Sequence, residues 1–156
     1  MAAVRKGERL RQLRIAVLAV LVVAALGLLL TRCPPNRDGM SGQLSQAMEE
    51  TAAAARSGAL ALDLRMRDRT TARLVSVQIS DARDEVVKAY EGIADLKADY
   101  PADLARQQFL TKSMTTIIDQ LNAASAHIRH VVSDPALPKL RADLMSSADE
   151  LESGYR

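Results

Sequence analysis

The arginine-rich stretch around residue 70 holds the side chains with the clearest capacity to bind a ligand. Four arginines recur there at short spacing: Arg65, Arg67, Arg69 and Arg73. A guanidinium group binds a carboxylate through two parallel hydrogen bonds, so these residues are candidate contacts for an anionic ligand or an acidic partner. Asp63 and Asp68 are interspersed among them, and such alternating charges are also typical of a solvated helix face. The sequence leaves both interpretations open.

The two histidines of the chain, His127 and His130, are three residues apart and would be neighbours on a helix. Such a pair can bind a metal ion from one side, but a site needs a third ligand. No other histidine is present, the only cysteine is Cys33, and Asp119 is not suitably placed. We therefore expect two solvent-facing histidines, no metal site and no cofactor.

Because Cys33 is the only cysteine, an intramolecular disulfide is impossible. The residue is a candidate for an intermolecular disulfide or for acylation of a thiol beside a membrane. The simpler interpretation is a free thiol at the edge of the bilayer.

Catalytic signatures are absent from the chain. The sequence contains no phosphate-binding glycine loop, no dinucleotide fingerprint, no zinc-protease helix motif and no serine-nucleophile motif. The connections between the expected helices are also too short to build an active site. We therefore expect that the protein is not an enzyme.

Charge is distributed unevenly along the chain. Residues 1–14 carry five basic side chains against one acidic, whereas residues 31–156 carry 16 basic and 18 acidic ones. Aromatic residues make up 3% of the chain, and Trp is absent. A mildly acidic body with so few aromatic rings for base stacking argues against a nucleic-acid partner. The Ala- and Arg-rich composition is common in GC-rich bacterial genomes.

An unbroken apolar run, Ile15–Leu30, follows the basic tail. As a helix it would span about 24 Å, and Arg14 and Arg32 can extend their charged ends to the lipid interfaces. The run predicts a single transmembrane helix over residues 15–31. Because most basic side chains precede it, we expect the tail, residues 1–14, in the cytoplasm and the domain after the helix outside the cell membrane.

Three other interpretations of this run fit the sequence less well. A cleaved signal peptide requires small residues ahead of the cut, whereas the run ends in Leu29, Leu30, Thr31 and Arg32. A lipoprotein signal fails for a related reason, since Arg32 stands directly before the cysteine. A buried helix of a soluble protein would leave the dense basic flank unexplained.

The segment after the apolar run is expected to be a short linker over residues 32–42, because Pro34 and Pro35 end a helix and favour an extended chain.

Residues 43–156 then repeat apolar side chains at alternating steps of three and four, typical of helices with one buried face. The first repeat contains Leu44, Met48, Thr51, Ala55, Gly58, Leu62 and Met66. The second contains Val75, Ile79, Ala82, Val86, Ala89, Ile93, Leu96 and Tyr100. The third contains Leu110, Met114, Ile117, Leu121, Ala124, Ile128 and Val131. The fourth contains Leu137, Leu140, Leu144, Ser147 or Ala148, Leu151 and Tyr155.

Helix-breaking residues fall between the repeats. Pro101 is expected in the first turn of one helix, with Asp103 near its positively polarised N-terminus. Asp134 and Pro135 predict the start of the last helix in the same way. The boundary at residues 67–71 lacks Gly and Pro, so it is either a turn capped by a threonine or a stutter in one long helix.

The stretch over residues 60–79 carries a conflicting signal. Leu60, Leu62 and Leu64 alternate with polar or small residues, as do Val75 and Val77, and alternation is the pattern of a strand. A hairpin would turn near residue 70. Helix is favoured because the first stretch is built of good helix formers and no Asn-Gly or Asp-Gly pair marks a tight turn.

These patterns predict an all-α fold, with one N-terminal transmembrane helix followed by an antiparallel bundle of three to four helices over residues 43–156. On the surface of the second helix, Lys88 is expected to pair with Asp84 or Glu85 one turn before it. The inward positions include many small residues, so a second copy or a partner protein would complete a thin core.

The expected function is that of a single-pass membrane protein whose helical domain binds another envelope or membrane protein, or itself. An alternative is a ligand-sensing bundle outside the membrane that works through a separate transducer, since helix bundles can shift on binding. A third interpretation, an envelope-disrupting protein such as a phage-type lysis factor, fits only the size and topology.

Overall fold

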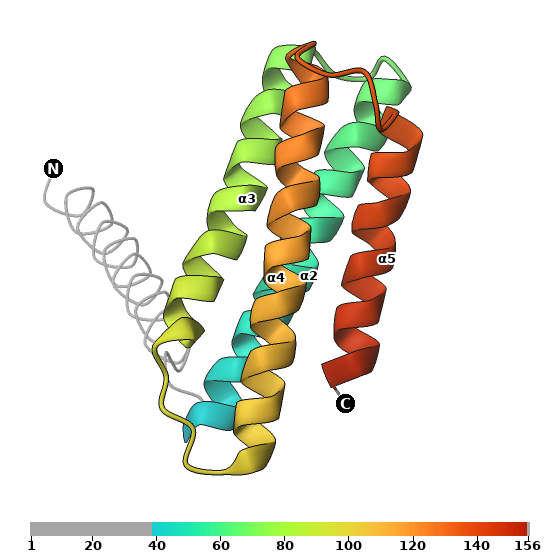
Figure 1. The fold of residues 1–156 in the computed structure, drawn as a ribbon. Helices are drawn as coiled ribbons and strands as arrows, with labels where there is room; N and C mark the ends of the chain where they lie inside the picture. The colour runs from blue at the N-terminus through green and yellow to red at the C-terminus, as the bar shows by residue number, and fades with distance from the viewer. Residues whose placement is uncertain (1–38, 156) are drawn as a thin grey trace, which may run out of the picture. The chain divides into compact units, whose positions relative to one another are not determined.

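The computed structural model describes residues 39–155, and within that range the chain forms four α-helices and no strand (Figure 1). The helices are α2 (Gly39–Met66), α3 (Ala72–Ala94), α4 (Pro101–Ile128) and α5 (Leu137–Tyr155). The predicted all-α bundle is therefore confirmed. The basic tail, the apolar run at residues 15–31 and Cys33 lie outside the described residues. Helix α2 begins at Gly39, inside the segment 32–42 expected to be a linker.

The helices are arranged in an antiparallel square (Figure 1). Each helix packs against the next along the chain, and α5 returns to pack against α2. Helix α2 also contacts α4 across the centre, whereas α3 and α5 lie on the other diagonal. One end of the bundle, which we call the distal end, holds the α2–α3 and α4–α5 connections; the other holds the start of α2 and the α3–α4 connection.

The predicted buried residues of α3 and α4 form half of the buried apolar residues of the core. On α3 the buried residues are Val75, Ile79, Ala82, Val86, Ala89 and Ile93. On α4 the buried apolar residues are Leu110, Met114, Ile117, Leu121, Ala124 and Ile128. On α5 they are Leu140, Leu144, Ala148 and Leu151, which settles the choice between Ser147 and Ala148.

Helix α2 reaches the bundle centre because its inward side chains are small. Eight of its ten buried residues are Ala, Thr or Gly, and the other two are Leu44 and Leu62. A Cβ atom added at Gly58 would lie 2.7 Å from Cδ2 of Leu121, so an alanine there would require the Leu121 side chain of α4 to shift. The hydroxyl of Thr51 is buried in the same core without a hydrogen-bond partner.

The boundary between α2 and α3 is a turn, so residues 43–100 contain two helices rather than one. Asp68 adopts a left-handed conformation (φ 51°), and the amide of Arg69 donates to the carbonyl of Leu64 at 2.9 Å. This pattern is the Schellman motif that ends many helices. The hydroxyl of Thr71 then accepts from the amide of Leu74 at 3.3 Å and starts α3.

Three residues at helix ends differ from expectation. Tyr100 is not part of α3, which ends at Ala94; it is the 70% exposed residue that precedes α4. Val131 is 69% exposed, because His130 adopts φ 58° and ends α4 in a second Schellman motif. Helix α5 begins at Leu137, not at Pro135, with the carbonyl of Ala136 accepting its first amide hydrogen bonds.

Candidate functional site

The arginine cluster predicted from the sequence lies at the distal end, but its members differ in their surroundings. Arg65 pairs with Asp68 at 3.0 Å, and Arg67 pairs with Asp63 at 2.8 Å. The carboxylate of Asp63 also pairs with Arg141 of α5 at 3.2 Å. Arg65 and Arg67 are thus already neutralised by carboxylates of the same bundle.

The other two arginines of the cluster have no such partner. Arg69 lies in the α2–α3 turn and Arg73 in the first turn of α3, and both are exposed. Neither side chain makes a hydrogen bond or an ion pair with any residue in the described part of the chain. Of the four predicted contacts, Arg69 and Arg73 are therefore the ones available to a partner.

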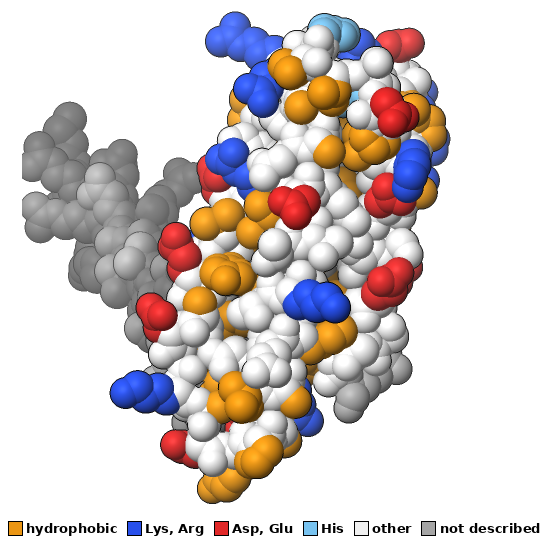
Figure 2. Space-filling model, in the orientation of Figure 1, with side chains coloured by type: hydrophobic (Ala, Val, Ile, Leu, Met, Phe, Trp, Pro, Cys, Tyr) orange, Lys and Arg blue, Asp and Glu red, His pale blue; other side chains and the backbone are white. Residues whose placement is uncertain are grey.

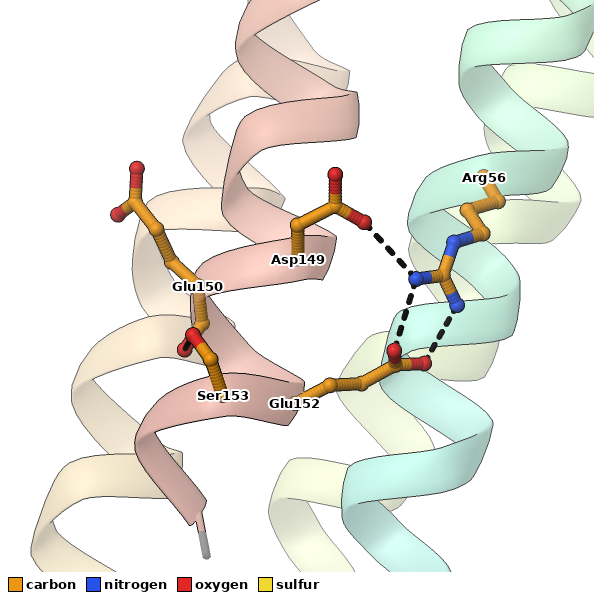
Figure 3. Close-up of polar contacts among 5 residues, drawn as sticks. All are labelled: Arg56, Asp149, Glu150, Glu152 and Ser153. Carbon is orange, nitrogen blue, oxygen red and sulfur yellow. Dashed lines mark hydrogen bonds and ion pairs between the residues drawn. The ribbon is translucent and has the colours of Figure 1, made fainter.

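A stronger ionic contact, not predicted from the sequence, joins α2 to α5 (Figure 3). The guanidinium of Arg56 binds both carboxylate oxygens of Glu152, and one of its nitrogens also donates to Asp149 at 3.0 Å. These two carboxylates raise the pKa of Arg56 further above its usual range, first through the hydrogen bond to Glu152. Because the group is satisfied within the bundle, it fastens two helices rather than offering a binding site.

Charged side chains on α2 and α5 are all engaged, whereas most of those on α3 are not. Every Asp, Glu, Lys and Arg of α2 and α5 takes part in a hydrogen bond or ion pair. On α3 only Arg83 and Asp84 pair, at 2.7 Å. The α3 side chains without a partner among residues 39–155 are Arg73, Asp81, Glu85, Lys88 and Glu91. The expected pairs of Lys88 with Asp84 or Glu85 do not form.

The same helix also exposes apolar surface. Leu74 and Val77 of α3 are each 51% exposed, and Leu60 of α2 is 58% exposed. Leu60 precedes the end of α2 by six residues and Val77 follows the start of α3 by five, so the antiparallel helices place them at the same height. We call Leu60, Leu74 and Val77, together with the unpaired charges of α3, the α3 face.

The α3 face explains the strand-like alternation in the sequence. Leu62, Val75 and Ile79 are buried in the core, whereas Leu60 and Val77 point to the outside of the same two helices. Apolar residues on two sides of a helix alternate along the chain without any strand. The signal for exposed apolar side chains was thus present in the sequence, as the conflict over residues 60–79.

Charge changes sign along the bundle. The distal end, taken as residues 60–79 and 121–144, carries seven basic and four acidic side chains. The rest of the described chain carries six basic and thirteen acidic ones. Along the edge of the molecule formed by α3, basic side chains near the distal end give way to acidic ones further down (Figure 2). The α3 face is therefore positive at one end and negative towards the middle.

The histidine pair lies at the distal end, and only one of the two side chains faces solvent as expected, because His127 is partly buried. His130 is exposed in the α4–α5 connection, and the Nδ1 atom of His127 is buried without a hydrogen-bond partner. Among residues 39–155, no group of three or more His, Cys, Asp or Glu side chains is placed to hold a metal ion.

No protein-family model, curated protein or solved structure matches this chain. Within the described residues, none of the helices is both long and apolar enough to cross a membrane.

Proposed function

We propose that the protein is a single-pass membrane protein whose helical bundle is an interaction module without catalytic chemistry. The apolar run at residues 15–31 supports the anchor, and its basic flank supports a cytoplasmic N-terminus with the bundle on the other side. The α3 face carries the interaction part of the proposal, because it combines half-exposed aliphatic side chains with charges that have no partner in the described bundle.

The α3 face differs from α2 and α5, because all charged side chains of those two helices are paired, whereas most of those on α3 are not. Exposed single aliphatic residues are common, but Leu60 and Val77 lie at one height on two adjacent helices, and Leu74 is one turn of α3 away from Val77. A partner that covers them would bury apolar area. It would also desolvate the neighbouring charges, and only opposite charges on the partner would offset that cost. The ligand-sensing alternative gains no support from the described residues, since Arg65 and Arg67 are paired internally.

The interaction is tested by placing a photo-crosslinking amino acid at Val77 in the full-length protein in its own membrane. We expect a discrete protein adduct that mass spectrometry identifies reproducibly and that disappears when Leu74 is changed to Asp. Asn122, an exposed residue of α4, is the matched control position and should give no adduct. Absence of an adduct from Val77, or equal adducts from Asn122, would contradict the proposal.

The anchor is tested separately. The full chain should stay with the membrane pellet after extraction at alkaline pH, and deletion of residues 15–30 should release it to the supernatant. A full chain that alkali extracts completely would show that the apolar run does not span the bilayer.

A further inference from the structure

We propose that the partner of the α3 face is a second copy of this chain, paired antiparallel about a twofold axis that passes beside Val77. This inference rests on the proposed interaction function and specifies its partner. The carrying observation is the order of the unpaired charges nearest Val77 on α3: Arg73 lies four residues before it, and Asp81 and Glu85 follow it, with the basic Lys88 further along the helix.

The spacing of these charges is symmetric about Val77. In an antiparallel pair centred on Val77, a residue n positions before it lies opposite the residue n positions after it in the other copy. Arg73 then lies opposite Asp81 of the second copy, whereas Arg69 is in the turn before α3 and is not placed by this count. The symmetry repeats this pair, so four side chains without an ion-pair partner in the described bundle each gain an opposite charge.

The apolar residues lie where this pairing needs them. Val77 is on the axis, Leu74 is one turn away, and Leu60 of α2 is at the same height on the adjacent helix. The two copies of each residue would therefore meet at the centre, with the ion pairs outside them. This arrangement of an apolar centre within a charged rim is that of ordinary protein interfaces.

Other partners fit the face less well. A parallel pair of α3 helices would place Arg73 against Arg73 and Asp81 against Asp81, and like charges repel. A uniformly acidic partner would be repelled by Asp81 and Glu85, and a uniformly basic partner would be repelled by Arg69 and Arg73. The pattern matches a surface with the same charges in reverse order, which a second antiparallel copy supplies.

The pairing also fixes the direction of the two bundles. Val77 lies one and a half turns from the start of α3, close to the distal end, whereas Gly39 begins α2 at the opposite end. An antiparallel overlap at the distal ends therefore places the Gly39 residues of the two copies at the far ends of the dimer. Such a dimer would join two bundles through their distal ends, an arrangement we call tip to tip.

The register is tested first by disulfide formation in the full-length protein in detergent, in a Cys33→Ser background. A cysteine at Val77 would face its own copy across the axis, so Val77→Cys should form a covalent dimer under mild oxidation. Asn122→Cys, equally exposed but on α4, is the matched control and should remain monomeric. Monomeric Val77→Cys protein, or equal cross-linking at both positions, would overturn the proposal.

Charge reversal provides the second test, with dimerisation measured by light scattering. Arg73→Glu and Asp81→Arg should each weaken self-association at least tenfold, because each places like charges opposite one another. The double variant Arg73→Glu/Asp81→Arg should recover most of the affinity, since it only exchanges the two partners. Lys112→Glu, an exposed charge on α4, should change nothing. Circular dichroism checks that every variant keeps its helix content.

The two proposals can fail separately. A photo-adduct at Val77 that contains a different protein, with no self-adduct, keeps the interaction function and overturns self-pairing. No adduct of any kind overturns both. Loss of association in both single variants without recovery in the double variant overturns the antiparallel register.

Discussion

At the scale of single residues, two glycines in helices show how closely the bundle is packed. Gly58 lies where α2 crosses α4, and an added Cβ atom would approach Leu121 to 2.7 Å. Gly92, on the exposed side of α3, has nothing within 4 Å of the same added atom. The same chemical change therefore has opposite consequences at the two sites.

Gly58→Ala is expected to lower the free energy of unfolding by about 1 kcal/mol, as an overpacking cost of ~1–3 kcal/mol exceeds a helix-propensity gain of ~1 kcal/mol. Gly92→Ala should raise it by about 0.5–1 kcal/mol, because only the propensity gain applies. Denaturant unfolding of the two variants checks the difference. Leu121→Ala should reduce the cost of Gly58→Ala by making room, and equal stabilities of the two alanine variants would contradict the close crossing.

Tyr155 fastens the end of α5 to the start of α2. Its hydroxyl donates to the carbonyl of Ser41 at 3.3 Å, and the guanidinium of Arg106 lies 5.7 Å from the centre of its ring. Burial raises the pKa of Tyr155 above its usual value of 10.0; the charge of Arg106 opposes this and that of Asp103 adds to it. The phenol is thus held in its neutral form.

This pKa shift predicts a loss of stability at alkaline pH. Because the folded pKa of Tyr155 is above the unfolded value of 10.0, the folded protein binds more protons in that range. The contribution is fully present below pH 10.0 and is lost as the pH rises through the folded pKa. Tyr155→Phe should flatten this alkaline decline in melting temperature, with Tyr100→Phe, a 70% exposed phenol, as the control. Identical alkaline curves for wild type and Tyr155→Phe would contradict the role of burial.

At the scale of helices, the end of α3 is completed by a side chain from α4. Gln107 is 8% exposed, and its side-chain amide nitrogen donates to the carbonyls of Ile93 at 2.6 Å and Leu96 at 3.0 Å. The last carbonyls of a helix have no partner within it, and α3 ends without a glycine. Gln107 supplies the missing donors from a neighbouring helix.

Gln107→Leu is expected to cost about 1–3 kcal/mol of stability, because it leaves buried carbonyls without their donor. Gln108→Leu is the matched control, since Gln108 is exposed and adjacent. Urea unfolding should show a lower midpoint for the first variant only, with an unchanged slope. A Gln107→Leu protein as stable as the control would show that the cap contributes nothing.

The helices with large buried side chains were predicted more accurately from the sequence than the helix with small ones. Helices α3 and α4 bury Val, Ile, Leu and Met at regular spacing, so their lines were confirmed almost residue by residue. Helix α2 buries mainly alanine, whose weak hydrophobic contrast conceals its wide buried face, and it begins four residues earlier than expected. The helix ends at Asp68 and His130 carry no glycine, so no local residue marked them.

The candidate site was predicted in part. The arginine cluster was visible as composition, but the pairing of Arg65 and Arg67 depends on the turn geometry and on Arg141 of α5. The contact of Arg56 with Glu152 joins residues 96 positions apart, and no local pattern reports such a pair. The outward position of Val77 depends on which side of α3 the other helices cover, and that is a tertiary property.

At the scale of the whole molecule, the charge distribution limits how copies can meet. The distal end has more basic than acidic side chains, whereas the rest of the described chain has about twice as many acidic as basic ones. Two copies set side by side in the same direction would align like charges along their whole length. An antiparallel overlap at the distal ends instead brings the positive end of each copy against the negative stretch of the other.

If each copy is anchored through the segment before Gly39, this tip-to-tip dimer bridges two membranes. Lipid vesicles that carry the full-length protein should therefore cluster, as a rise in light scattering would show. Arg73→Glu should abolish the clustering and Arg73→Glu/Asp81→Arg should restore it, while Lys112→Glu vesicles should behave like wild type. Raising the salt to 1 M shortens the screening length from about 8 Å to about 3 Å and should disperse the clusters. Vesicles that stay dispersed although Val77→Cys cross-links within them would show that both copies lie along one membrane, and the bridging prediction would be wrong.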